Sequence, residues 1–72
     1  MSVDMHPVQS SNLRAVGYDP EMRVLLVQFR SGATYEYDDV PQTVYEGLLG
    51  AQSKGRYVAQ NVKGQYDCQR RT

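Results

Sequence analysis

The chain has 72 residues, a net charge of zero and one cysteine, Cys68, so we expect a single small domain with no internal disulfide. Its balanced charge argues against strong nonspecific binding of nucleic acid, and no apolar run approaches the roughly 20 residues of a membrane span. The free thiol and the lack of a signal peptide point to the reducing cytoplasm.

The start of the chain is expected to be mobile. Residues 1–9 have no periodic pattern, and Pro7 discourages regular structure. The first strand is predicted from Leu13 to Tyr18, followed by a turn over Asp19–Met22. Strand alternation divides this strand into two faces, one with Leu13, Ala15 and Gly17 and the other with Arg14, Val16 and Tyr18.

Two further strands form the centre of the chain. The second is predicted from Arg23 to Arg30 and the third from Ala33 to Asp38. Gly32 between them fits a tight hairpin turn, because glycine tolerates a positive φ. The residues expected on the core side of these strands are Leu25, Val27, Phe29, Ala33, Tyr35 and Tyr37. Three antiparallel strands with short links make a meander.

A helix is expected to follow Pro41, since proline is favoured in the first helical turn. It should run to about Lys54, with Leu48 on its apolar stripe. Two residue pairs could form a capping box at its start, and the sequence does not choose between them: Asp39 with Gln42, or Thr43 with Glu46.

A second, short helix is predicted over Arg56–Lys63, with Gly64 after it. Gly55 is a candidate stop for the first helix in the left-handed conformation, and Val58 and Val62 lie four residues apart, as a helix face requires. The predicted architecture is therefore an α+β domain over residues 10–66, a three-stranded antiparallel meander followed by two helices, with a basic tail over residues 67–72.

Residue types that carry out catalysis are scarce. His6 is the only histidine and lies in the first nine residues, and Cys68 has no histidine near it in the sequence that could act as its base. A zinc site needs more His or Cys ligands than these two, and no glycine-rich phosphate loop follows a strand. We expect no enzyme activity, no metal and no cofactor.

Charge and aromatic residues are unevenly distributed. Residues 1–50 carry three arginines against seven carboxylates, a net charge of −4, and residues 51–72 carry five basic residues against Asp67, a net charge of +4. Tyrosines interleaved with cations bind single-stranded nucleic acid, because bases stack on rings while cations follow phosphates. The predicted nucleic-acid-binding residues are Lys54, Arg56, Tyr57, Lys63, Tyr66 and Arg70.

Other roles for these side chains stay open. Lys54 and Lys63 lie near predicted helix C-termini, where a cation is favourable without any ligand. The alternative function is a protein-interaction or regulatory module of bacterial or phage origin. For either function the chain is expected to be a monomer or a weak homodimer. The interaction module would use an open edge at the first or third strand, or a second sheet face that stays exposed. The apolar residues assigned to that face are Val16, Tyr18, Val24 and Leu26.

The sequence also contains a series of short matches to a known domain, over about residues 9–66. These are Ser10-Ser11-Asn12-Leu13, Val16-Gly17-Tyr18-Asp19, Leu26-Val27, Phe29, Gly32, Tyr35-Glu36-Tyr37, Val40-Pro41, Val44-Tyr45, Ser53-Lys54-Gly55-Arg56-Tyr57, Asn61-Val62 and Tyr66. In their order and spacing they resemble the KTSC domain, which is named after the C-terminus of some lysyl-tRNA synthetases and also occurs as small free-standing proteins of bacteria and phages.

The synthetase context of the family suggests RNA binding, and the resemblance implies no more than that. Val58 stands where the family often has phenylalanine, and Val62 where isoleucine is common. These differences thin the apolar face of the second helix or leave it differently packed. They also remove one possible stacking ring, which slightly weakens the RNA interpretation. We therefore expect a small cytoplasmic module that binds RNA or an RNA-associated protein.

Overall fold

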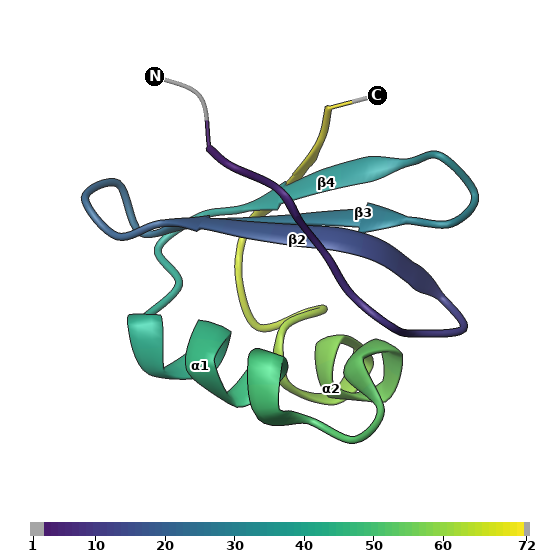
Figure 1. Ribbon diagram of the computed structural model, residues 1–72. Helices are drawn as coiled ribbons and strands as arrows, with labels where there is room; N and C mark the ends of the chain where they lie inside the picture. Colours follow the sequence, from purple (N-terminus) through teal and green to yellow (C-terminus); the bar gives the residue numbers. More distant parts are fainter. Residues whose placement is uncertain (1–2, 72) are drawn as a thin grey trace.

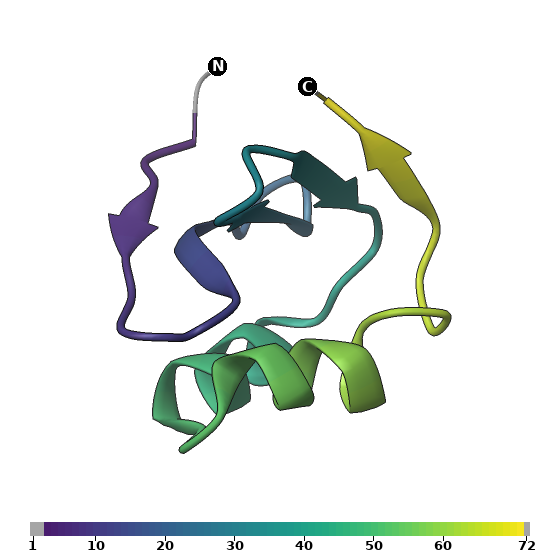
Figure 2. The same cartoon turned by 90° about the vertical axis from the view of Figure 1, so that its right-hand side faces the viewer.

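The structure is a computed structural model that describes residues 3–71. Its sheet is antiparallel, with the strands in the order β1-β2-β3-β4-β5, and both helices cover one face of it (Figures 1 and 2). The elements are β1 (His6–Pro7), β2 (Leu13–Asp19), β3 (Val24–Phe29), β4 (Thr34–Tyr37), α1 (Gln42–Gly50), α2 (Lys54–Asn61) and β5 (Cys68–Arg70). The predicted α+β class and the central meander are confirmed.

Two short edge strands extend the predicted meander. In β1, His6 pairs with Val16 of β2, and in β5, Cys68 pairs with Tyr37 of β4. The expected lead-in and tail thus each contribute a strand, although residues 1, 2 and 72 lie outside the described part of the chain. The open edges expected at the first and third strands are therefore occupied. Strands of two and three residues are too short to show the alternation of apolar and polar residues by which a strand is predicted.

The core lies between the sheet and the helices, as the alternation of β3 and β4 predicted. Leu25 is opposite Tyr37 in the register, and both are buried together with Leu48 of α1. Val58 and Val62 of α2 complete this cluster. Directly paired residues share a face of a sheet, so Leu25 and Tyr37 lie on the same side. Their burial in one cluster with Leu48 shows that this is the side of the helices.

The faces predicted for β2 were wrong. Leu13 pairs with Phe29 but Ala15 pairs with Gln28, so the register shifts between them. Such a bulge reverses the alternation that follows. As a result Val16 is fully buried on the helix side, paired with Val27, and Tyr18 stacks on Tyr45 of α1 with ring centroids 5.1 Å apart. Neither residue belongs to the outer face.

The outer face of the sheet is covered at Gly17 by the beginning of the described chain. A Cβ on Gly17 would lie 2.6 Å from the carbonyl oxygen of Asp4 and 2.9 Å from the sulfur of Met5. Only glycine permits this close approach without displacement of the segment. Val24 and Leu26, which do lie on the outer side, are half-buried.

The helix boundaries differ from the prediction at the junction between the helices. Pro41 precedes α1 without a side-chain cap, so neither of the two capping boxes forms. Helix α1 ends at Gly50, and Ser53 then caps α2 by accepting a hydrogen bond from the Arg56 backbone N–H at 3.4 Å. Gly55, expected as a stop, lies in the first turn of α2, because the serine cap starts this helix before it. Across residues 3–71, neither helix is long and apolar enough to cross a membrane.

Candidate binding pocket

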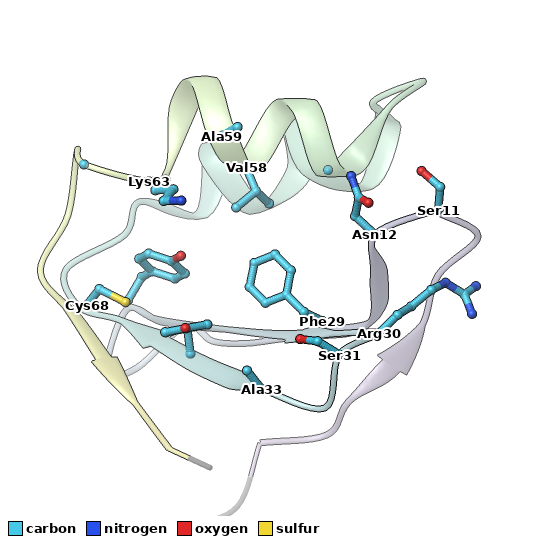
Figure 3. Close-up of a pocket in the computed structure, with 14 residues that line it drawn as sticks. Ser11, Asn12, Phe29, Arg30, Ser31, Ala33, Val58, Ala59, Lys63 and Cys68 are labelled. Carbon is cyan, nitrogen blue, oxygen red and sulfur yellow. The ribbon is translucent and has the colours of Figure 1, made fainter.

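An open pocket lies between the inner face of the sheet and α2 (Figure 3). Its volume is about 690 Å³, which falls within the range of sites that bind small organic groups. The lining residues are Ser11, Asn12, Phe29, Arg30, Ser31, Ala33, Tyr35, Tyr37, Gly55, Val58, Ala59, Lys63, Gly64 and Cys68. They come from β3, β4, β5, α2, the loop before β2, the β3–β4 turn and the segment after α2.

Aromatic rings from the sheet line one side of the pocket. Phe29 and Tyr35 are only partly buried, and their rings meet edge to face with centroids 5.5 Å apart. The opposite wall comes from α2, which presents Gly55, Val58 and Ala59. These side chains are too small to fill the space above the two rings. The pocket therefore results from large residues on the sheet facing small residues on the helix.

The rim of the pocket is positively charged. Lys63 is exposed, and its backbone N–H donates to the Val58 carbonyl at 2.7 Å, which holds the residue at the end of α2. Within residues 3–71 its ammonium makes no ion pair. Arg30 donates from Nε to the Ser10 carbonyl at 2.7 Å. No carboxylate is present among the lining residues, so the local field favours an anion.

Strand β5 adds a third cation to this side of the sheet. Arg70 pairs with Tyr35 in the register, and directly paired residues lie on the same face. Arg71 follows it and forms an ion pair with Glu36 at 2.8 Å, which ties the end of the strand to β4. The predicted binding residue Arg70 therefore lies on the pocket side of the sheet.

Tyr37 lies deeper, next to Cys68. Burial of its ring, followed by the neighbouring Cys68 thiol, raises the pKa of the Tyr37 hydroxyl to about 12. The hydroxyl therefore stays protonated and neutral at physiological pH. Tyr37 supplies no negative charge to offset the cations and no base for proton transfer.

The other predicted binding residues lie outside the pocket. Tyr57 packs its hydroxyl end against Gly47 of α1, and Tyr66 is half-buried against the core. Lys54 donates from Nζ to the Ala51 carbonyl at 3.1 Å, at the C-terminal end of α1. Arg56 is exposed. Of the six, only Lys63 lines the pocket and only Arg70 shares its face of the sheet through a register pair, so the predicted residues do not form one cluster.

Sequence reasoning assigned none of the lining residues except Lys63 to binding, and the missed ones include Asn12, Phe29, Arg30 and Tyr35. Phe29 and Tyr35 had been assigned to the core side, which is correct. The space above them exists because α2 has no large side chain at the facing positions. The thin apolar face of that helix, noted at Val58, was the one signal for it. No group of three residues that could hold a metal ion occurs in the part of the chain that the structure describes.

Comparison with known proteins agrees with the resemblance in the sequence. A model of the KTSC domain family matches residues 9–66. The chain belongs to the KTSC domain family. A KTSC domain protein from Yersinia pestis, known from its crystal structure, superposes with a TM-score of 0.93 at 38% identity, covering 99% of this chain and 100% of that one.

Two kinds of relatives share this KTSC domain. Small proteins include one from Tsukamurella paurometabola, 47% identical over 86% of this chain and 92% of its own length, and one from Stutzerimonas stutzeri, 51% identical over 82% of this chain and 83% of its own. A lysine–tRNA ligase from Nostoc sp. is 43% identical over 81% of this chain, but the match spans only 10% of the ligase. Similarity to so small a part of the ligase does not extend its activity to this chain.

Proposed function

We propose that this KTSC domain is a non-catalytic cytoplasmic module that binds single-stranded RNA, with the pocket beside α2 as its site. The observation that carries the proposal is a pocket lined by two partly exposed rings, Phe29 and Tyr35, and by the cations Arg30 and Lys63, with no carboxylate among its lining residues. Each base stacked on an aromatic side chain contributes about 1–3 kcal/mol, and cations along the rim attract the phosphates.

The relatives support this choice of ligand. KTSC regions occur within lysine–tRNA ligases, whose name states that they act on an RNA. The protein-interaction alternative depended on open edges at the first and third strands, and β1 and β5 pair with these edges. The segment before β1 also covers the outer face at Gly17, where that alternative expected an exposed surface. We therefore retain RNA as the ligand.

Titration of the ¹⁵N-labelled chain with a random-sequence hexaribonucleotide pool at low salt tests the proposal. We expect the largest shift changes at pocket residues such as Phe29 and Lys63. Affinity should fall as salt rises, with a slope of about −0.7 for each phosphate neutralised on a single strand. A titration at low salt that leaves the pocket signals unchanged would refute the proposal.

Two matched variants distinguish the pocket from general attraction to basic residues. Lys63→Ala should reduce the steepness of the salt dependence by about 0.7, because one phosphate contact is lost. Arg56→Ala removes an exposed cation of the same helix that does not line the pocket, and we expect it to leave the slope almost unchanged. Equal effects of the two variants would show that binding does not centre on the pocket.

A further inference from the structure

We propose that Asn12 determines base specificity in this pocket by hydrogen bonding to the edge of one inserted base. The proposal rests on the proposed function and names the residue that distinguishes one base from another. Asn12 comes immediately before β2 and lines the pocket. It is the one lining residue with a carboxamide side chain, a group that offers both a hydrogen-bond acceptor and two donors.

The backbone of Asn12 is fixed on both sides of the residue. Its N–H donates to the Ser10 hydroxyl at 3.2 Å, and its carbonyl accepts from the Arg30 backbone N–H at 2.9 Å. These bonds connect the residue to the loop before β2 and to the end of β3. Because the backbone is already fixed at this residue, little further backbone entropy is lost when its side chain binds a ligand.

The side chain is exposed and contacts α2 on one side. A Cβ on Gly55 would lie 2.9 Å from Nδ2 of Asn12 and 3.2 Å from its Cβ, so the amide packs directly on the first turn of α2. Within residues 3–71 the amide makes no hydrogen bond. This exposed amide, which contacts α2 beside the aromatic pocket and has no hydrogen-bond partner among the described residues, is available to a ligand.

The arrangement of the lining residues matches the parts of one nucleotide. Figure 3 shows Asn12 and Lys63 on opposite sides of Phe29. A base that stacks in the pocket at Phe29 would present its edge to Asn12, and its phosphate would lie toward the Lys63 ammonium. Unstacked bases of single-stranded RNA are recognised in this way, by stacking combined with hydrogen bonds to the base edge.

The test compares hexaribonucleotides of adenosine, cytidine and uridine by fluorescence anisotropy. We expect the best and the worst of them to differ by about fivefold or more, the lower end for a two-bond amide–base contact. Asn12→Ala should reduce the difference to within about twofold, because stacking alone tolerates every base. Asn61→Ala is the matched control, since Asn61 is an exposed asparagine of α2 that does not line the pocket.

Asn12→Asp keeps the shape of the side chain but removes its donors. Relative to the unchanged protein, this variant should favour adenosine and cytidine over uridine. The exocyclic amino groups of adenine and cytosine can donate to the new carboxylate. Uracil has a carbonyl in place of that amino group, and two acceptors repel each other. Because the shape is kept, the variant provides a folded protein even if alanine disturbs the contact with Gly55.

The outcomes distinguish failure of the role of Asn12 from failure of RNA binding itself. Equal binding of all hexamers, or a base preference that both Asn12 variants leave unchanged, overturns the role of Asn12 while RNA binding stands. Absence of binding to any hexamer overturns both. The corresponding nucleoside monophosphates are titrated in parallel. If they bind as tightly as the hexamers with the same preference, base reading by Asn12 stands and a free nucleotide replaces RNA as the ligand.

Discussion

Replacing Leu48 by alanine is expected to lower the free energy of unfolding by about 2–5 kcal/mol. Leu48 is fully buried and is the one buried residue of α1, and it lies in the same cluster as Leu25 and Val27 of the sheet. The substitution removes the most deeply buried contact between α1 and the sheet and leaves a cavity. A domain of this size has a small stability margin, so we expect a large unfolded population even without denaturant. Urea titration followed by circular dichroism measures the loss.

Leu49→Ala is the control for this experiment. The residue is the next one on the same helix, and 44% of its surface is exposed. The substitution removes the same atoms as Leu48→Ala but from an exposed position. We therefore expect the free energy of unfolding to change by about 0.5 kcal/mol or less. Similar losses at the two positions would mean that α1 does not dock on the sheet through Leu48, and the assignment of the core would be wrong.

Filling the pocket by Ala59→Trp is expected to weaken binding of the hexaribonucleotide pool by about tenfold or more, because a base that can no longer stack forfeits about 1–3 kcal/mol. Ala59 is exposed and lines the pocket wall formed by α2, so the new ring can occupy the pocket without entering the core. The free energy of unfolding should change little. Anisotropy titration and urea unfolding of the same samples measure both effects.

Gln60→Trp adds the same ring one residue further along the helix. Gln60 is exposed and does not line the pocket, and we expect this variant to bind RNA like the unchanged protein. If Ala59→Trp also bound like the unchanged protein, the pocket would not be the binding site. If both variants lost affinity equally, the outer surface of α2 would be the site in its place.

The central part of the fold could be predicted because its patterns are local. The alternation of Leu25, Val27 and Phe29 identified the core face of β3 directly, and the register confirms it by pairing Leu25 with Tyr37. The hairpin turn was predicted from Gly32, whose φ is 102°. Each of these features depends on neighbouring residues only, so it is present in the sequence.

Features that depend on distant pairing could not be predicted. The bulge between Leu13 and Ala15 leaves the local alternation looking regular, so it reversed the faces assigned to Val16 and Tyr18 without any signal. Strand β5 is recognisable only through its pairing with β4, since its residues are all exposed. At the helix junction the sequence analysis expected a stop at Gly55 and did not consider Ser53, whose side chain caps α2 and starts this helix before Gly55.

The pocket was the least predictable part of the molecule. Charge and tyrosine counts led to six residues, of which only Lys63 lines it. Tyr57 does not reach the pocket because it lies on the side of α2 that faces α1, where its ring packs toward Gly47. The pocket exists because Ala59 and Gly55 are small where Phe29 and Tyr35 are large, and this requires knowledge of which residues face each other across the two layers.

The most direct test of RNA binding in the pocket uses Cys68, the single cysteine of the chain. It is exposed and lines the pocket, so its rate of alkylation by iodoacetamide reports on access to the site. We predict that the rate falls to a small fraction of its initial value as the hexaribonucleotide pool saturates the folded chain, and that the pool has no effect in urea. A rate that stays constant at saturating RNA would contradict the account, because RNA would then bind elsewhere.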